Sequence, residues 1–366
     1  MSITEQALSY IRGISPYVPG KPITELARDM GLPVEKIVKL ASNENPLGMS
    51  PKARAAVEQA IAGLGRYPDQ FELIVALAER LGVGQNQIVL GNGSNDVLDL
   101  AARVFLAPGR SAVFAQHAFA VYPLATMSTG AECIAVPARH YGHDLAAMRG
   151  AIKVNERPDT RLVWIANPNN PTGNFLPNPE IHAFLRTVPA DVAVVLDEAY
   201  NDYLLPAERV DTVAWLKEFS NLIITRTFSK IYGLAGLRVG FAVAAPELAD
   251  LLNRVRQPFN LNNLALVAAR AALDDHLFVA ESYQLNRRGM EQIVAGLKRL
   301  GLEHIPSHGN FVTFAVGDGA AVNQKLLKQG VIVRPIGGYG LPNHLRVTIG
   351  LETENARFLA ALETSL

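Results

Sequence analysis

The segment TFSKIYGLAGLRVG, residues 227–240, directly follows a short apolar run. It gathers two small hydroxyl side chains, three glycines, one lysine and one arginine in a single turn region. A phosphate group requires hydroxyl and cationic donors and a backbone that can approach closely, so Thr227, Ser229 and Arg238 are candidate phosphate ligands. Lys230 adds an amine that could form a Schiff base. The segment therefore predicts a phosphate site beside a reactive amine.

Two stretches upstream also place polar residues directly after an apolar strand pattern. Residues 192–200, VAVVLDEAY, predict a buried parallel strand that ends in Asp197. Residues 162–173, LVWIANPNNPTG, predict a strand followed by a tight loop. Ligands of open α/β sheets bind beyond the carboxyl ends of the strands, which places Asp197 where a cofactor would lie. From these residues alone, an N-cap role for the carboxylate and simple turn formation in the loop stay open.

Taken in chain order, the loop at 167–173, the strand ending in DEAY at 197–200 and the segment TFSK at 227–230 with Arg238 resemble the fold-type I pyridoxal phosphate aminotransferases, and the resemblance extends over nearly the whole chain. Three further stretches, YVPGK at 17–21, LASNENPLG at 40–48 and LRVTIG at 345–350, closely resemble the histidinol-phosphate aminotransferases within that group. The resemblance implies an α/β fold in which a large cofactor-binding domain holds a mostly parallel seven-stranded sheet between helices. We expect this domain at residues 49–250, with a smaller α+β domain built from residues 1–48 and 251–366.

The spacing of apolar residues agrees with that division. Strands are expected at 87–90, 111–114, 132–135, 161–166, 193–196, 222–225 and 239–244. Helices are expected between them, including 51–62, 71–81 and 97–105. This alternation indicates a mostly parallel sheet that is covered on both faces. After Pro246, helices predominate to residue 300, and a smaller set follows, with strands at 311–314, 331–334 and 344–349 and a helix at 352–362.

Composition limits the class of protein. The 366 residues are 49% apolar and 19% charged, which suits a chain with a sizeable core. Lys and Arg total 34, as do Asp and Glu, so we expect neither nucleic acid nor an acidic membrane as a partner. Cys133 is the single cysteine, no signal-like or membrane-spanning run occurs, and none of the eight histidines has metal-ligand spacing. We expect a soluble cytoplasmic protein without a metal site.

The segment GNGSND, residues 91–96, lies between an expected strand and an expected helix. Free backbone N–H groups and the helix dipole make such a position an anion site. The resemblance assigns Gly93, Ser94 and Asn95 to the cofactor phosphate, with Ser and Asn where Ala and Asp are more usual. Backbone donation survives that change.

The resemblance also implies the remaining contacts to pyridoxal phosphate. Lys230 would carry the cofactor and act as the base, and Asp197 would keep the pyridine nitrogen protonated. The other implied contacts are the 3′ oxygen for Asn170 and Tyr200, ring stacking for Tyr122, and the phosphate for Thr227, Ser229, Arg238 and, from the neighbouring subunit of a homodimer, Tyr67. Taken one at a time and without the resemblance, most of these residues would be explained by core packing or ion pairing.

Two arginines are the implied substrate ligands. Arg334 and Arg346 each lie in an expected strand and match family residues that bind substrate. A planar guanidinium pairs with carboxylate or phosphate through two hydrogen bonds. The pair could serve glutamate in one half-reaction and a phosphate ester in the other. Tyr17 and Asn43 are expected beside the substrate.

The resemblance implies transamination between L-histidinol phosphate with imidazole-acetol phosphate and glutamate with 2-oxoglutarate, in histidine biosynthesis. Two stretches depart from the usual pattern, Asn201 to Tyr203 and His117 to Val121. They leave open an aromatic or broad-range aminotransferase. A pyridoxal phosphate decarboxylase of a phosphorylated amino acid is an alternative from another reaction class. A binding module without catalysis is a third, which the presence of Lys230 and Asp197 disfavours.

Overall fold

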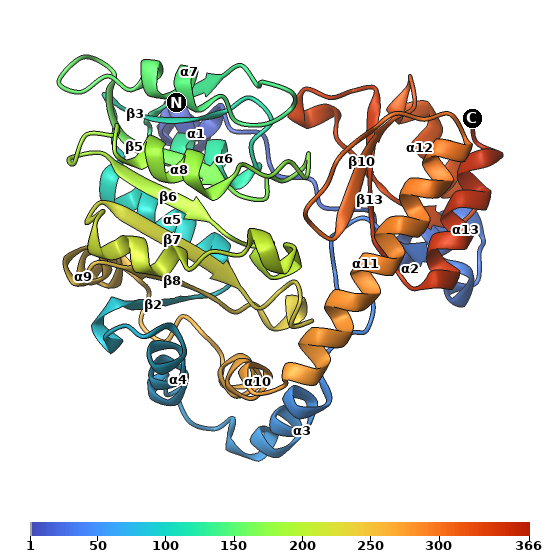
Figure 1. The fold of residues 1–366 in the computed structure, drawn as a ribbon, viewed down its shortest axis with the longest axis horizontal. Coiled ribbons are helices and arrows are strands. Elements are labelled where there is room, and N and C mark those ends of the chain that lie inside the picture. The colour runs from blue at the N-terminus through green and yellow to red at the C-terminus, as the bar shows by residue number, and fades with distance from the viewer. Residues whose placement is uncertain (1) are drawn as a thin grey trace.

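The computed structural model describes residues 2–366, and its largest element is a seven-stranded sheet (Figure 1). The strand order is β2-β8-β7-β6-β5-β3-β4. The strands are β2 (Ile88–Gly91), β3 (Arg110–Ala115), β4 (Glu132–Val136), β5 (Asp159–Ala166), β6 (Ala193–Asp197), β7 (Leu222–Thr227) and β8 (Gly240–Ala244). β8 runs antiparallel to β2 and β7, and the other neighbouring pairs are parallel. The predicted α/β fold with a mostly parallel seven-stranded sheet is confirmed.

Helices cover both faces of this sheet, which is why its strands are apolar on both sides. Successive side chains of a strand point to opposite faces, so Val194 and Leu196 belong to one core and Val195 to the other. The Val195 face is covered by α5 (Ser94–Phe105), α6 (Val121–Ser128) and α9 (Pro246–Val255). The opposite face is covered by α4 (Phe71–Leu81), α7 (Leu145–Ala151), α8 (Asn178–Leu185) and α10 (Asn263–Leu273).

Local sequence explains where these helices begin. Ser50 caps α3 (Pro51–Ala60) by accepting a hydrogen bond from the Ala53 N–H at 3.1 Å, with proline at the first helical position. α5 begins at Ser94, three residues before the predicted start. Its first turn therefore includes Ser94 and Asn95, directly beyond the end of β2.

A smaller sheet with the order β12-β13-β10-β9 forms the second unit. Its strands are β9 (His304–Ile305), β10 (Phe311–Ala315), β12 (Arg334–Pro335) and β13 (His344–Thr348), and it packs with α11 (His276–Arg299), α12 (Gly319–Lys328) and α13 (Glu352–Glu363). The N-terminal segment joins this unit, because β1 (Val38–Lys39) pairs with β11 (Val331–Ile332) and α2 (Ile23–Met30) buries Leu26 beside it.

The single strand predicted at 331–334 was wrong. Val331–Ile332 pairs with β1, whereas Arg334–Pro335 pairs with β13 in the other sheet. The chain changes sheets at Val333, and proline at 335 has no N–H with which to extend the ladder. The change of sheet brings Arg334 to the side of β13 that carries Arg346.

The domain boundaries stay a prediction. α10 follows the predicted boundary at residue 250, yet its apolar side chains join the core that contains Ala53, Leu73 and the large sheet. We therefore propose that the large unit continues through α10 and that α11, which runs from one unit to the other in Figure 1, is the connection.

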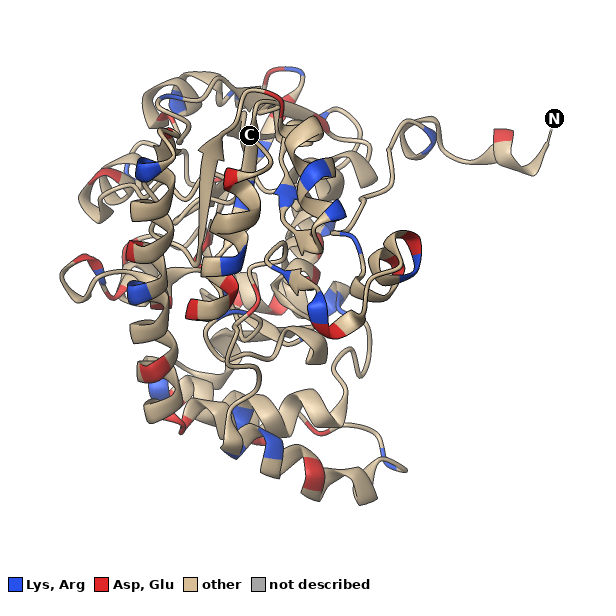
Figure 2. Ribbon diagram, turned by 90° about the vertical axis from the view of Figure 1, so that its right-hand side faces the viewer, with Lys and Arg blue, Asp and Glu red and all other residues tan. Residues whose placement is uncertain are grey.

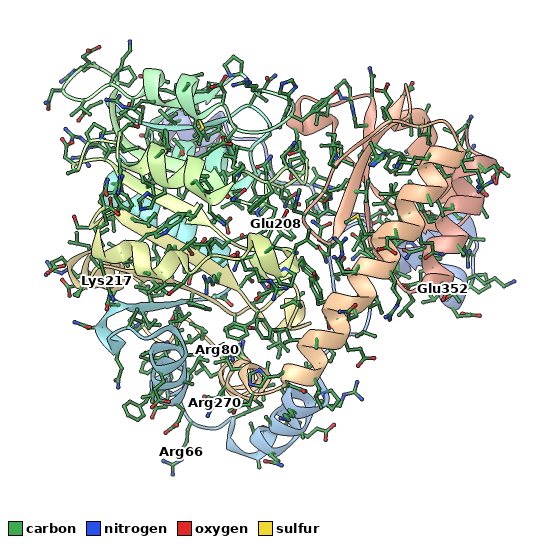
Figure 3. All side chains as sticks on the ribbon, in the orientation of Figure 1. Arg66, Arg80, Glu208, Lys217, Arg270 and Glu352 are labelled. Atoms are coloured by element: carbon green, nitrogen blue, oxygen red, sulfur yellow. The ribbon has the colours of Figure 1, made fainter. Side chains whose placement is uncertain are left out.

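The two units meet along a seam. Glu208 of the large unit lies there (Figure 3), and its Oε1 is 3.2 Å from Nε2 of His308 in the small unit. The His308 N–H donates to the Gly173 carbonyl at 2.9 Å, and the Thr313 hydroxyl donates to the Pro171 carbonyl at 2.5 Å. The loop that contains Asn170 is thus held by both units.

Positions of Lys and Arg and of Asp and Glu are interspersed along the ribbon in Figure 2, where the N-terminal residues extend away from the body. Across residues 2–366, no helix is long and apolar enough to cross a membrane.

Candidate active site

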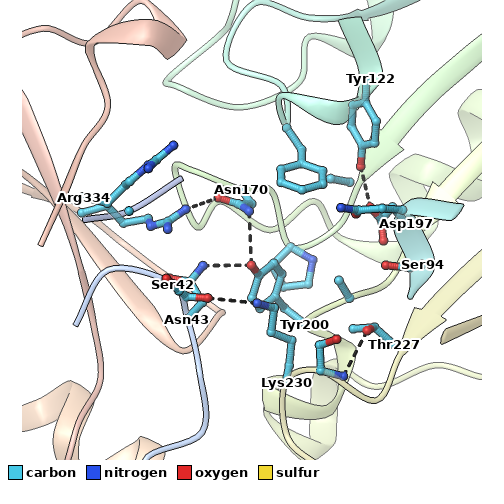
Figure 4. A pocket seen from close by; sticks show the side chains of 18 of the residues that line it. Ser42, Asn43, Ser94, Tyr122, Asn170, Asp197, Tyr200, Thr227, Lys230 and Arg334 are labelled. Carbon is cyan, nitrogen blue, oxygen red and sulfur yellow. Dashed lines mark hydrogen bonds between the residues drawn. The ribbon is translucent and has the colours of Figure 1, made fainter. Parts of the chain in front are cut away.

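A cavity lies at the carboxyl ends of β5, β6 and β7, where the small unit faces the sheet (Figure 4). Of the predicted site residues, the cavity brings together Tyr17, Asn43, Ser94, Asn95, Tyr122, Asn170, Asp197, Tyr200, Thr227, Ser229, Lys230, Arg238, Arg334 and Arg346. Gly93 is adjacent to it, and Tyr67 lies elsewhere. Residues more than 300 positions apart therefore line one space.

Lys230 lies in the turn after β7 and points into the cavity (Figure 4). Its Nζ donates to the Ser42 carbonyl at 3.2 Å and lies 5.7 Å from the centre of the Tyr200 ring. Burial, aided by the positive charges of Arg346 and Arg238, lowers its pKa to about 8. At pH 7 about a tenth of the amine is therefore uncharged, roughly 300-fold more than at the ordinary lysine value of 10.5, and the uncharged form is the one that acts as nucleophile or base.

Asp197 ends β6 at the bottom of the cavity. Its carboxylate accepts hydrogen bonds from the Tyr122 hydroxyl at 2.8 Å and the Thr225 hydroxyl at 3.1 Å. Burial raises its pKa, and these hydrogen bonds oppose that shift. Among residues 2–366 no cation forms an ion pair with this buried carboxylate, which favours a protonated partner in the cavity, such as a pyridinium nitrogen.

Tyr122 is fully buried, and its ring lies parallel to that of Trp164, with centroids 5.1 Å apart. Because it donates to Asp197, it fixes the direction of that carboxylate. Its predicted role of stacking on the cofactor ring stays a prediction. Sequence reasoning missed Phe119, which lines the cavity and packs edge-on against Tyr122 at 5.9 Å. Phe119 is a second candidate for stacking, and its position in the same aromatic loop was the available signal.

The first turn of α5 and the turn after β7 form one anion-binding corner. Arg238, in the left-handed region with φ +59°, donates to the Ala235 carbonyl at 2.9 Å and the Ser229 hydroxyl at 3.3 Å. Its guanidinium occupies the space that a Cβ on Gly93 would need, which explains glycine there. The Thr227 hydroxyl accepts from the Ser229 N–H at 3.1 Å. The N-terminus of α5, the two hydroxyl groups and the guanidinium thus lie around one corner of the cavity, an arrangement that suits a phosphate group.

Tyr200 faces Asp197 across the cavity floor. Its hydroxyl oxygen accepts from Nδ2 of Asn43 at 2.9 Å and Nδ2 of Asn170 at 3.2 Å. Burial raises its pKa to about 12, so the hydroxyl is protonated at neutral pH. Within residues 2–366 no group accepts its proton, which leaves it available to an acceptor in the cavity.

Two guanidinium groups line the small-unit side of the cavity. Arg346 is buried and donates to Asn170 Oδ1 at 2.5 Å and to the Ala41 carbonyl at 2.8 Å, while its Nε has no partner among the described residues. Burial lowers its pKa. Arg334 donates to the Val18 carbonyl at 2.9 Å and the Tyr17 hydroxyl at 3.2 Å.

In the described chain neither arginine pairs with a carboxylate. Arg346 is buried and Arg334 partly so, and a positive charge withdrawn from water without a counter-ion favours an anionic ligand. Two guanidinium groups facing one cavity therefore indicate a substrate with at least two negative charges.

Tyr67 is 79% exposed and stacks on Phe259, with ring centroids 4.5 Å apart. Ile61, Leu64 and Phe71, which lie within six positions of it in the chain, are also exposed. The chain itself thus gives Tyr67 no access to the cavity, and its predicted role in a neighbouring subunit stays a prediction.

Next to Asp197, the buried Glu198 forms an ion pair with Arg226 at 2.8 Å and accepts from the Thr212 hydroxyl at 2.6 Å. Sequence reasoning gave Glu198 no role, because its partners lie 14 and 28 positions away. The pair braces the ends of β6 and β7. Among residues 2–366, no group of three His, Cys, Asp or Glu side chains could hold a metal ion.

Comparison with known proteins shows that residues 35–362 match the family of aminotransferase class I and II. The chain belongs to this family. Among known aminotransferases it is 78% identical over 366 residues, the full length of both chains, to histidinol-phosphate aminotransferase 1 of Dechloromonas aromatica. It is 60% identical over 369 residues to histidinol-phosphate aminotransferase 2 of Nitrosospira multiformis, covering all of this chain and 93% of that one.

Solved aminotransferase structures agree. The histidinol-phosphate aminotransferase from Sinorhizobium meliloti, in complex with pyridoxal-5'-phosphate, matches with a TM-score of 0.89 and 28% identity over 98% of this chain and 96% of that chain. The resemblance to histidinol-phosphate aminotransferases drawn from the sequence is confirmed.

Proposed function

We propose that this aminotransferase uses pyridoxal phosphate to move an amino group between L-histidinol phosphate with imidazole-acetol phosphate and glutamate with 2-oxoglutarate, in histidine biosynthesis. The observation that carries the proposal is the pair of guanidinium groups, Arg334 and Arg346, without acidic partners beside a buried lysine. It is supported by the names of relatives up to 78% identical over the full chain.

The cavity fits the proposed cofactor at each of its polar groups. Asp197 suits the ring nitrogen, and the Tyr200 proton with Asn170 suits the ring oxygen. The phosphate suits the corner formed by Ser94, Asn95, Thr227, Ser229 and Arg238. When bound, pyridoxal phosphate supplies a reactive carbonyl carbon and a ring that accepts an electron pair from the substrate Cα.

The protein's own residues then hold the substrate and move a proton. Lys230, with a pKa of about 8, would take the proton from the substrate Cα and would deliver it to the carbon that is the carbonyl carbon of the free cofactor. The unpartnered Nε of Arg346 suits the α-carboxylate of glutamate. Arg334, steadied by Tyr17, suits the second anionic group, either the side-chain carboxylate or the phosphate of L-histidinol phosphate.

A pH profile tests the role of Lys230. Because only the uncharged amine attacks a carbonyl carbon, reactivity rises about tenfold per pH unit below a pKa of about 8 and is level above it. We expect protein stripped of cofactor to take up added pyridoxal phosphate with this profile, measured by visible absorbance in stopped flow. A midpoint near the ordinary lysine value of 10.5, or no pH dependence, would contradict the assignment.

We also propose a cytoplasmic homodimer in which Tyr67 reaches the partner's cavity. The exposed rings of Tyr67, Phe71 and Phe259, with Ile61 and Leu64, form an apolar surface that suits a second copy. Sedimentation of the purified protein measures the assembly, and a monomer at micromolar concentration would contradict it. Cell fractionation tests the location.

Steady-state assays separate the reaction classes. With L-histidinol phosphate and 2-oxoglutarate together, we expect glutamate to form, and neither compound alone should react beyond one equivalent. A higher kcat/KM with aromatic amino acids would favour the broad-range alternative. Release of carbon dioxide from O-phospho-L-serine without any oxo acid would favour the decarboxylase.

A further inference from the structure

His117 belongs to the large unit and lies just after β3, in the loop where this sequence departs from the usual family pattern. It is 6% exposed, and its Nδ1 is 2.7 Å from the backbone carbonyl of Tyr339 in the small unit. A carbonyl oxygen only accepts hydrogen bonds, so Nδ1 carries the proton. The Asn169 side chain donates to the His117 carbonyl at 2.9 Å and fixes the backbone from which the ring projects.

Tyr339 ends the short helical turn Gly337–Tyr339, whose next residue, Gly340, has φ +78°. A Cβ on Gly340 would lie 3.6 Å from His117 Nδ1, so ring and turn are in close contact. The Tyr339 side chain lines the active-site cavity together with Arg334, whose positive charge opposes the rise that burial causes in the pKa of Tyr339. A single hydrogen bond from His117 thus links the large unit to the turn that supports Arg334.

The hydrogen bond spans the two units, so it exists only while the small unit lies against the large one. Arg334 itself is anchored by contacts within the small unit and the N-terminal segment, to Val18 and Tyr17. Without His117, the turn Gly337–Tyr339 keeps no other hydrogen bond to the large unit among those described. Among the described residues, this bond is therefore the one hydrogen bond by which the large unit holds the backbone of the turn that carries Tyr339.

We propose that His117 is a positioning residue for substrate recognition: it holds the turn Gly337–Tyr339 so that Tyr339 and Arg334 present a fixed surface to the distal anionic group of the substrate. The identity of that anionic group rests on the proposed function. The contact between His117 and Tyr339 does not. His117 does not line the cavity and acts through Tyr339. Its loss should therefore weaken substrate binding more than it slows the chemical step.

The test compares His117→Leu, which removes the donor at similar size, with His117→Asn, whose amide nitrogen can occupy the place of Nδ1. One neutral hydrogen bond corresponds to about a 3- to 10-fold change in affinity. For His117→Leu we expect the KM for L-histidinol phosphate to rise by about that factor, with kcat changed less than about twofold. For His117→Asn we expect a KM much closer to that of the wild type. His276→Leu, an exposed histidine at the start of α11, is the matched control.

A second readout does not depend on turnover. Amide hydrogen exchange in the substrate-free protein should be several-fold faster over residues 336–341 in His117→Leu and unchanged in His117→Asn. Unchanged KM and unchanged exchange in His117→Leu would overturn the proposal, as would a loss confined to kcat. If wild-type protein does not convert L-histidinol phosphate, the proposed function fails, and the exchange experiment still decides the role of His117.

Discussion

Lys230→Ala is expected to lower turnover by about 10³-fold or more, because it removes both the nucleophile and the base from the cavity. The fold should persist, since among residues 2–366 the Lys230 Nζ makes one hydrogen bond, to the Ser42 carbonyl, and burial disfavours its charged form. Turnover, melting temperature and mass spectrometry after borohydride reduction are the measurements. In wild-type protein the reduced cofactor should be found on Lys230, and in the variant on no residue.

Lys217→Ala is the matched control, because Lys217 is exposed at the end of the helical turn Thr212–Lys217 and is not among the residues that line the cavity. It should retain wild-type turnover and cofactor content. Turnover within tenfold of wild type in folded Lys230→Ala would contradict the assigned role.

Asp197→Asn is expected to reduce turnover by about 10²-fold or more, because an amide cannot hold a pyridinium proton by a charge-assisted hydrogen bond. In the cofactor-free protein, by contrast, the same substitution should not lower the folding stability. Burial raises the Asp197 pKa above its ordinary value of 3.8, so at neutral pH the folded state holds the charge at a cost. Stability from this group is full below pH 3.8 and is lost as pH rises through the folded pKa.

Without cofactor, Asp197→Asn should therefore be as stable as wild type or slightly more stable at pH 7. Cofactor binding should raise the melting temperature of Asp197→Asn much less than it raises that of the wild type. Asp250→Asn, on the surface of α9 beside Arg254, should show the wild-type gain. An undiminished cofactor-induced rise in Asp197→Asn, with wild-type turnover, would exclude Asp197 as the partner of the ring.

The large sheet was predictable because each strand is a short apolar run bounded by Gly, Pro, Asn or Asp, and such signals are local. The residues at strand ends, such as Asp197, could be placed for the same reason. The change of sheet at Val333 was not predictable, because β1, almost 300 positions away, provides the partner for Val331 and Ile332.

Within the site, too, local sequence signals could be read, whereas contacts between distant residues could not. The resemblance pointed to Arg346 and Asn170, yet their hydrogen bond joins residues 176 positions apart and depends on how the two units close. Phe119 and His117 were passed over because they lie in the loop that departs from the usual pattern. Side-chain direction in such a loop is set by packing against Tyr122 and Tyr339 rather than by local sequence.

The most direct measurement is a single half-reaction with purified protein that carries pyridoxal phosphate. L-histidinol phosphate, L-glutamate and L-phenylalanine are mixed with it separately, without an oxo acid, and the visible absorbance of the lysine-bound cofactor is followed in stopped flow. Our account predicts rapid loss of that absorbance with L-histidinol phosphate and slow loss with L-phenylalanine. Loss with L-phenylalanine as fast as or faster than with L-histidinol phosphate would contradict it.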